Sequence, residues 1–316
     1  MRTEQRLALL FPGQGSQRPG MLAGLPDSPA VSRTIEEARQ EIGPLAAWDT
    51  ADAFRTSTGA QVALLVAGVA GSRSVTDDCG VLPGIVAGHS VGAFAAAVTA
   101  GVLTFAEALA TVQLRGQLMD RTADGGHWGM AAIEGLRRLD VERLVRRVAT
   151  DSEPLWLANI NSVDQMVVSG SATALARCAQ AAPDAGARRM QRLDMVVASH
   201  CPLQAATAQR LAEHLSRVPR RAQTIAYLTN TGGRRIVNDA EAVLDDLARS
   251  VAQPVRWFDA MRLMTEIGVT HALQMPPGHV LVGLLPADVR HHVAALDDPA
   301  HTGTIEDLLR DLGTPY

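Results

Sequence analysis

Short, uniformly apolar runs alternate along the chain with longer segments of helical character. The run Leu7–Phe11 ends at Pro12-Gly13, and the run Ile85–Ala87 ends at Gly88. Each is long enough for a buried strand and too short for a buried helix. Helices are predicted after these runs, over residues 28–42, 58–71, 91–100 and 105–119. Strands that alternate with helices in this way are typical of an α/β protein with a parallel sheet.

The pattern changes after the glycine-rich break Asp124-Gly125-Gly126. Over about the next 70 residues the predicted order is strand, helix, strand, strand, helix, strand, which is typical of a ferredoxin-like unit. These elements are expected at Gly129–Ile133, Asp140–Ala149, Leu155–Ala158, Gln165–Ser169, Thr173–Ala182 and the end of Ala187–Val197. We therefore expect a small subdomain at residues 126–197, inserted between two parts of a large α/β subdomain at residues 1–125 and 198–316.

The final part of the chain returns to alternating strands and helices. Helices are predicted at Pro202–Arg217, Ala240–Val251 and Arg256–Ile267, and strands at Ile225–Leu228 and His271–Met275. With 316 residues, of which 47% are apolar, the chain can form one large domain that carries a smaller insert.

Charge and cysteine content exclude several classes of function. The net charge is −4, and no run of like charges points to nucleic acid or a membrane surface. No apolar stretch reaches the roughly 18 residues of a membrane-spanning helix. The three cysteines, Cys79, Cys178 and Cys201, are far apart, which argues against a disulfide framework or a zinc site. We expect a cytoplasmic protein without a bound metal.

The most informative motif is Gly88-His89-Ser90-Val91-Gly92, which directly follows a predicted strand and precedes an alanine-rich helix. It fits Gly-x-Ser-x-Gly, the strand-to-helix elbow that presents a nucleophilic serine. Glycines remove Cβ atoms where strand and helix crowd together, and the helix N-terminus favours a developing oxyanion. The alternative is an ordinary glycine-bounded turn, because the chain holds 27 glycines.

A nucleophilic serine needs a base, and His200 has the most suitable setting among the nine histidines. It lies where a predicted strand gives way to a helix, at the rim of an α/β sheet. The alternative is a loop histidine without a catalytic role. His89 neighbours Ser90, but adjacent residues of an elbow point apart, so an orienting or packing role is expected for it.

Several segments, spread in order over nearly the whole chain, resemble the malonyl-CoA:acyl carrier protein transacylases. The matching segments are Phe11–Gln17, Gly88–Gly92, Gln113–Met119, Gly129–Ala132, Asn159-x-Asn161 with Gln165–Gly170, Ser199–Cys201, Gln253–Trp257 and Pro277–Leu281. One matching segment alone would be weak evidence, but the occurrence of all these segments in the same order is strong evidence. The resemblance implies an α/β-hydrolase-like large domain with a parallel sheet and a nucleophile elbow, and an inserted ferredoxin-like subdomain.

The resemblance also implies roles for individual residues. Ser90 would form a malonyl ester, and His200 would act as general base and then as acid. Gln253 would orient His200 by a hydrogen bond, in place of the aspartate of a triad. The backbone N–H groups of Gln14 and Val91 would form the oxyanion hole. Supporting roles fall to Gly88, His89, Gly92 and Asn159.

Arg115 is implied to hold the free carboxylate of the malonyl group, since a guanidinium can grip a carboxylate with two hydrogen bonds. No permanent cofactor is implied. Malonyl-CoA would be the donor, and the acceptor would be the phosphopantetheine-type thiol of an acyl carrier protein. Ser199, just before His200, leaves room for an α-methyl group, so the exclusion of methylmalonyl is left open.

Three segments narrow the resemblance further. Gln17–Leu22, Ser90–Val98 and Pro276–Leu281 are most similar to the epsilon subunit of biotin-independent malonate decarboxylase, and Ala93 stands where fatty-acid transacylases commonly carry Glu. That subunit would load malonyl onto a decarboxylase carrier protein. The alternatives are a transacylase of fatty-acid or polyketide synthesis and, more distantly, a serine hydrolase or thioesterase.

Overall fold

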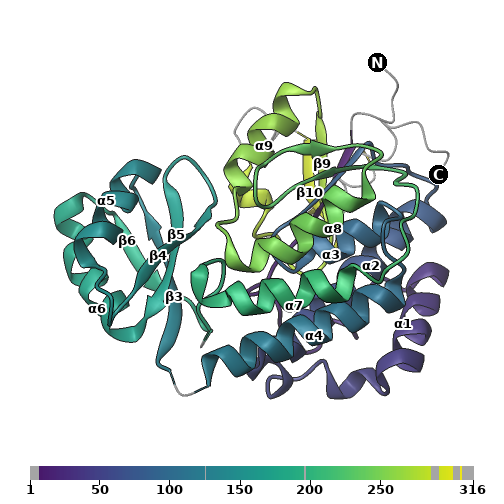
Figure 1. Ribbon diagram of the computed structural model, residues 1–316. Helices are drawn as coiled ribbons and strands as arrows, with labels where there is room; N and C mark the ends of the chain where they lie inside the picture. Colours follow the sequence, from purple (N-terminus) through teal and green to yellow (C-terminus); the bar gives the residue numbers. More distant parts are fainter. Residues whose placement is uncertain (1–6, 125, 196, 286–291, 302–306, 308–316) are drawn as a thin grey trace.

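The computed structural model describes residues 7–124, 126–195, 197–285, 292–301 and 307, and these form two units (Figure 1). The strands are β1 (Leu7–Phe11), β2 (Ile85–Gly88), β3 (Trp128–Glu134), β4 (Leu155–Ile160), β5 (Gln165–Ser171), β6 (Arg189–Arg192), β7 (Ala226–Leu228), β8 (Arg235–Ile236), β9 (His271–Gln274) and β10 (Val293–Ala295). The α-helices are α1 (Pro29–Ile42), α2 (Ser57–Arg73), α3 (Gly92–Thr99), α4 (Phe105–Ala123), α5 (Arg138–Val148), α6 (Ala172–Ala181), α7 (Ala205–Leu215), α8 (Ala240–Arg249) and α9 (Trp257–Glu266).

The large unit is built on a mainly parallel sheet with strand order β10-β9-β1-β2-β7-β8. Among the described strands of this six-stranded sheet, only β8 runs antiparallel to its neighbour. All five residues of β1 are buried, as expected for a central strand covered on both faces. Alternate residues of β1 therefore enter two different hydrophobic clusters.

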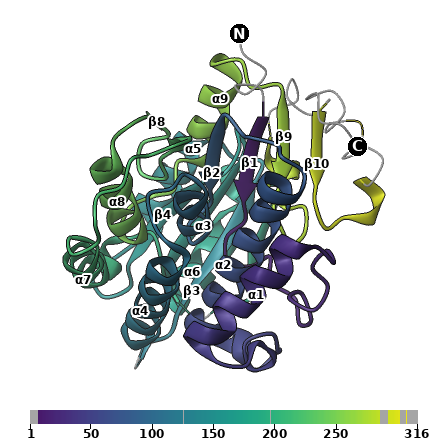
Figure 2. The same ribbon diagram turned by 90° about the vertical axis from the view of Figure 1, so that its right-hand side faces the viewer.

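Helices cover both faces of this sheet (Figure 2). Leu7, Leu9 and Phe11 of β1 join a cluster that includes residues of α2, α3 and α4. Ala8 and Leu10 face the other side and pack in a cluster with Trp257 and other residues of α9. Burying each large apolar side chain stabilises the fold by about 1.5–3 kcal/mol. The sheet thus fixes the position of the carboxyl ends of β1, β2 and β7, which lie side by side.

The small unit consists of β3, α5, β4, β5, α6 and β6, and lies to one side of the large unit in Figure 1. Its strands pair antiparallel in the order β4-β5-β3-β6. It has a hydrophobic cluster of its own, in which strand residues such as Ile133 and Val168 contact helix residues such as Leu144 and Leu175. Two main-chain hydrogen bonds tie β4 to Val255 of the large unit: Ile160 N to Val255 O at 2.8 Å and Val255 N to Ala158 O at 2.9 Å.

The mixed α/β architecture with a mainly parallel sheet agrees with the sequence analysis, and the main differences are at element boundaries. The predicted helix 202–217 begins as a 3-10 turn, Pro202–Gln204, and continues as α7. Strands β8 and β10 were not predicted, because runs of two and three residues carry too little pattern. Gly125, in the predicted break after α4, lies outside the described residues.

Two further expectations concern membranes and cysteines. No helix within the described ranges combines the length and the apolar character that crossing a bilayer requires. The three cysteines are all free thiols: Cys79 is exposed, whereas Cys178 and Cys201 are buried.

Candidate active site

Ser90 occupies a tight turn between β2 and α3, at the carboxyl edge of the parallel sheet. Its φ is +54°, in the left-handed region, which costs a non-glycine residue about 1–3 kcal/mol. The flanking glycines are sterically required. A Cβ on Gly88 would stand 2.1 Å from the main chain of α3, and one on Gly92 would stand 2.2 Å from Phe11 O. The turn therefore has the tight geometry of a nucleophile elbow.

His200 lies directly against Ser90, although 110 residues separate them in the chain. The distance from His200 Nε2 to Ser90 Oγ is 2.8 Å, and His200 Nδ1 lies 2.6 Å from Ser250 O. Because a carbonyl only accepts, Nδ1 carries the hydrogen and Nε2 presents its lone pair to the serine hydroxyl. The main-chain N–H of His200 donates to Val251 O at 2.7 Å, and the φ of His200 is +60°.

The residue that orients His200 differs from our expectation. The sequence analysis assigned this hydrogen bond to Gln253, but the structure gives it to the main-chain carbonyl of Ser250. The main chain of Gln253 contributes only a weaker interaction that raises the pKa of His200. The 3-10 turn Ser250–Ala252 after α8 directs a carbonyl group at the ring, so the identity of the side chain is not what orients the histidine.

His200 is neutral near neutral pH. Its burial, followed by the positive charge of Arg115, lowers the pKa of the imidazole to about 3, although the hydrogen bond to Ser250 O opposes this shift. His200 can therefore accept the hydroxyl proton of Ser90 without first losing one of its own.

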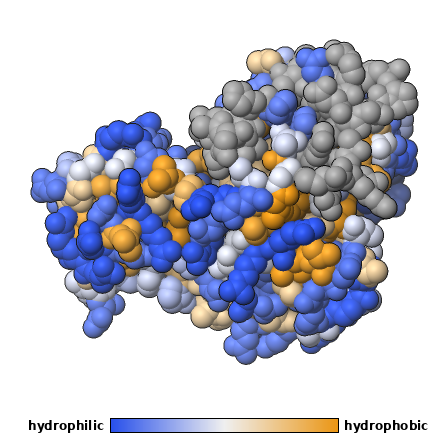
Figure 3. Space-filling model, turned by 90° about the horizontal axis from the view of Figure 1, so that it is seen from above, coloured by the Kyte–Doolittle hydropathy of each residue, from blue (hydrophilic) through white to orange (hydrophobic). Residues whose placement is uncertain are grey.

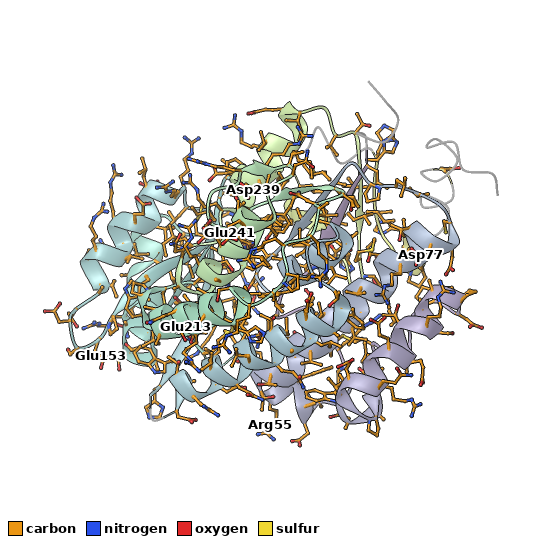
Figure 4. All side chains as sticks on the ribbon, turned by 45° about the vertical axis from the view of Figure 1, so that its right-hand side comes forward. Arg55, Asp77, Glu153, Glu213, Asp239 and Glu241 are labelled. Carbon is orange, nitrogen blue, oxygen red and sulfur yellow. The ribbon has the colours of Figure 1, made fainter. Side chains whose placement is uncertain are left out.

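Arg115 of α4 brings a positive charge into the same site. Its Nη2 lies 3.0 Å from Ser90 Oγ, and its Nη1 donates to Gln61 Oε1 at 2.5 Å. Surface charges such as Arg55 and Asp77 lie at the periphery (Figure 4), whereas Arg115 is only 1% exposed. Burial lowers its pKa to about 10, so the guanidinium remains charged at neutral pH. No carboxylate pairs with it in the described part of the chain.

A buried cation without an anionic partner is unfavourable, because desolvation is not repaid. Arg115 Nε also lacks a hydrogen-bond partner among the described residues. The guanidinium is therefore placed to bind an anionic group of a ligand beside Ser90.

A cleft of about 390 Å³ opens between the loop after β1 and the sheet of the small unit. Figure 3 shows polar and apolar residues interspersed over the face that joins the two units. Asn159 of β4 lines the cleft; it is 7% exposed, and its Oδ1 has no partner within the described residues. His89 also lines it, with Nε2 3.1 Å from Asn161 Oδ1 and its ring 5.5 Å from that of Trp257.

Of the two residues proposed for the oxyanion hole, Gln14 lines this cleft and Val91 directly follows Ser90. Gln14 lies three residues after β1, and Val91 lies three residues after β2. Because β1 and β2 pair up to Phe11 and Gly88, both residues lie at the same edge of the sheet. Within the ranges that the structure covers, no hydrogen bond is found for the main-chain N–H of either residue. Both N–H groups are thus free to bind an oxyanion.

Comparison with known proteins identifies the family. Residues 8–297 match the family described as the acyl transferase domain. The malonyl CoA-acyl carrier protein transacylase of Salmonella typhimurium is 35% identical over 301 residues, covering 93% of this chain and 97% of that protein. The enzyme of the same name from Haemophilus influenzae is 34% identical and covers 96% of this chain and 99% of its own. The chain belongs to the malonyl-CoA:acyl carrier protein transacylase family.

Solved structures of this transacylase family have the same fold. The malonyl CoA-acyl carrier protein transacylase of Coxiella burnetii superposes with a TM-score of 0.89 at 31% identity, over 99% of each chain. A malonyl-transacylase solved in complex with a type II PKS acyl-carrier protein also gives 0.89, at 34% identity over 97% of this chain and 100% of that one.

Two residues that support this transacylase site escaped the sequence analysis. Gln61 is fully buried in α2, next to the apolar run Val62–Val66, and the only amide side chain of such a helix is a signal that could have been used. Ser250 acts through its main-chain carbonyl, for which a sequence offers no signal. The residues that were predicted from separate segments, Ser90, Arg115 and His200, are brought together by the fold.

Proposed function

We propose that the protein transfers a malonyl group from malonyl-CoA to the phosphopantetheine thiol of an acyl carrier protein, through an ester on Ser90. The observation that carries this proposal is Arg115, a buried guanidinium that has no acidic partner among the described residues and lies 3.0 Å from Ser90 Oγ. A substrate with a free carboxylate would supply the missing anion at the place where the serine reacts.

In the first half-reaction, His200 Nε2 takes the proton of Ser90 Oγ as the oxygen attacks the thioester carbonyl. The N–H groups of Gln14 and Val91 stabilise the oxyanion of the tetrahedral intermediate. When the C–S bond breaks, the imidazolium returns the proton to the leaving CoA sulfur. In the second half-reaction, the carrier thiol gives its proton to His200 and attacks the ester, and Ser90 recovers its proton.

The neutral carbonyl of Ser250 suits this chemistry. A carboxylate in its place would stabilise the imidazolium more strongly, as in a hydrolase triad. Thiols are better leaving groups than amines, so the weaker stabilisation is sufficient. Exchange between two thiols thus needs only a modest base, which matches a histidine whose pKa is lowered by burial and by Arg115.

The malonyl group and the pantetheine arm of the substrate would have different surroundings. Arg115, held by Gln61, faces the carboxylate, while Asn159 lines the outer cleft. The unpartnered Oδ1 of Asn159 would accept a hydrogen bond from an amide N–H of the pantetheine arm. No permanent cofactor enters this scheme.

For the acceptor, the relatives favour an acyl carrier protein over the decarboxylase carrier that the sequence analysis preferred. Support for the decarboxylase epsilon subunit still consists of three segments and Ala93, all inside or near the site. We therefore place the acyl carrier protein first and keep the decarboxylase carrier as the competing acceptor.

We also propose the finer architecture that the resemblance implies. The antiparallel order β4-β5-β3-β6 with two helices supports a ferredoxin-like subdomain at residues 126–197. The parallel sheet with an elbow after β2 supports a hydrolase-like large domain at residues 1–125 and 198–316. A cytoplasmic location is part of the same proposal.

The experiment incubates the protein with malonyl-CoA labelled in the malonyl group and maps the labelled residue by mass spectrometry. We expect a stable adduct on Ser90, no adduct in Ser90→Ala, and a normal one in Ser216→Ala, which removes an exposed serine. An adduct that persists in Ser90→Ala would disprove the mechanism.

A chase of the labelled enzyme then identifies the acceptor. We expect the label to move faster to a phosphopantetheinylated acyl carrier protein than to a decarboxylase carrier protein or to water. Faster transfer to the decarboxylase carrier would favour the assignment as a malonate decarboxylase epsilon subunit, and rapid loss of the label to water would indicate a hydrolase.

A further inference from the structure

Asp246 of α8 is a buried carboxylate that lies behind the candidate active site. It is 1% exposed, and no arginine or histidine pairs with it in the described residues. Its Oδ2 accepts hydrogen bonds from Tyr227 Oη at 2.9 Å and Asn230 N at 3.0 Å. Its Oδ1 accepts from Thr231 N at 2.9 Å and Thr231 Oγ1 at 2.7 Å.

Four donors offset the cost of burying this charge, which would otherwise be several kcal/mol. Burial and the neighbouring carboxylate raise the pKa of Tyr227 well above its usual value, so its hydroxyl remains a donor. The carboxylate thereby fixes the turn after β7, and with it the main chain of Asn230.

Asn230 in turn clamps the elbow. Its Oδ1 accepts a hydrogen bond from Ser90 N at 2.9 Å, and its Nδ2 donates to Gly88 O at 2.9 Å. One amide side chain thus joins the end of β2 to the strained serine. Both ends of the amide are used, which fixes its orientation. These two bonds help to hold Ser90 at a φ of +54°, where a residue other than glycine is strained.

The same helix also leads to the acceptor for His200. The N–H of Ser250 donates to Asp246 O at the end of α8, so the two residues lie one helical turn apart. Ser250 O accepts from His200 Nδ1, and Val251 O accepts from His200 N. Through the turn after β7, Asp246 holds Asn230, which bonds to Ser90. Through the end of α8, it is linked to Ser250, whose carbonyl bonds to His200.

We propose that Asn230 and Asp246 are positioning residues that hold Ser90 and His200 in their reactive alignment. Asn230 acts on Ser90 directly, and Asp246 acts through Asn230 and the end of α8. This inference rests on the proposed role of Ser90 as nucleophile. Neither side chain bonds to Arg115 or Gln61, so the grip on the substrate carboxylate is separate from the alignment of the nucleophile.

The separation gives the proposal a kinetic signature. A misplacement of a reacting group by about 1 Å can cost on the order of 100-fold in rate. Replacing Asn230 should therefore slow the malonylation of Ser90 while leaving the binding of malonyl-CoA nearly unchanged. Replacing a residue that only stabilises the fold would change the melting temperature without slowing malonylation selectively over the binding of malonyl-CoA.

The experiment measures single-turnover malonylation of Ser90 over a range of malonyl-CoA concentrations, together with thermal unfolding. For Asn230→Ala we expect a maximal rate lower by about 10- to 100-fold, with a half-saturating concentration within about twofold of the wild type. Asn230→Asp keeps an acceptor for Ser90 N and loses the donor to Gly88 O, so an intermediate rate is expected. Asp246→Asn should also slow malonylation.

Thr99→Val is the matched control, because it removes the contacts of the Thr99 hydroxyl with Ser72 Oγ and Ala95 O at the far end of α3 and leaves both contacts of Asn230 in place. It should lower the melting temperature while retaining the wild-type rate. A wild-type rate in folded Asn230→Ala and Asn230→Asp would overturn the proposal, as would a slowing that Thr99→Val shares at equal loss of stability. Labelling that survives in Ser90→Ala would instead overturn the nucleophile assignment itself.

Discussion

At the scale of single residues, Arg115 has the clearest functional signature. It is a large cation that is almost fully enclosed, and its neighbours are a neutral amide and the serine hydroxyl. A charged group in such a place is unfavourable for folding unless a partner arrives. In the proposed function, Arg115 would therefore favour ligands with a carboxylate and disfavour uncharged acyl groups.

Replacing Arg115 by methionine should remove this preference while filling much of the same volume. Charged hydrogen bonds are worth about 1.5–3 kcal/mol each, so malonylation from malonyl-CoA should slow by about 100-fold or more. Acetylation of Ser90 from acetyl-CoA should change far less. The measurement is the ratio of kcat/KM for the two donors. Arg121→Met, an exposed arginine of the same helix, should keep the wild-type ratio, and an equal loss for both donors in Arg115→Met would contradict the role.

At the scale of elements, the β2–α3 turn is built from steric limits. Strand β1 lies so close to the first turn of α3 that a Cβ on Gly92 would stand 2.2 Å from Phe11 O and 2.7 Å from Pro12 O. These are main-chain atoms of the last residue of a central strand and of the residue after it, which cannot move independently of the sheet. The closeness is what brings the N–H of Gln14, just after β1, to the same edge as Ser90.

Gly92→Ala should therefore destabilise the protein by at least about 2 kcal/mol and reduce malonylation in the fraction that remains folded. Gly24→Ala provides the comparison, because the added Cβ would lie at an ordinary contact distance of 3.5 Å on the exposed surface. Its stability should stay within about 1 kcal/mol of the wild type. Chemical unfolding of both variants tests this, and equal stability would show that β1 and α3 can separate without cost.

At the scale of the whole molecule, two units must meet to complete the site. The large unit supplies Ser90, His200 and Arg115, whereas Asn159 and Asn161 come from the small unit. Main-chain bonds between β4 and Val255 and the His89–Asn161 contact hold the units together. The folded protein also buries His89 and His200, and their burial links the stability of the molecule to pH.

The free energy of unfolding should fall as the pH drops from 7.5 to 5.5. Burial lowers the pKa of His89 and of His200, the latter to about 3, whereas the unfolded chain takes up protons near pH 6.5. Below that value the unfolded state binds more protons, so stability is lost as pH falls. His200 alone should contribute a loss of about 1.4 kcal/mol by pH 5.5.

Urea unfolding at the two pH values measures this loss. His200→Gln should reduce it by about 1.4 kcal/mol, whereas replacing His214, which is only partly buried, should reduce it less. An identical pH dependence in His200→Gln and the wild type would mean that His200 binds protons equally in the folded and unfolded states, which would contradict the lowered pKa.

The sequence by itself determined the order of the elements, the elbow and the family. The apolar runs at β1 and β2, the glycines around Ser90 and the motifs that carry Arg115 and His200 are local patterns, and local patterns depend on neighbours in the chain. From them, most helices and strands and three central site residues could be named. Strands as short as β8 and β10 could not, since pairing with neighbours defines them.

Only the tertiary structure decided which groups serve those residues. The sequence assigned the hydrogen bond to His200 to Gln253, whereas in the structure the carbonyl of Ser250 accepts it. The contributions of Gln61, Asn230 and Asp246, which come from distant segments, are visible only in the structure. A main-chain carbonyl is chemically the same at every position, and a buried amide acts through its distance and direction. Both depend on how helices and strands pack, and therefore the fold settles them.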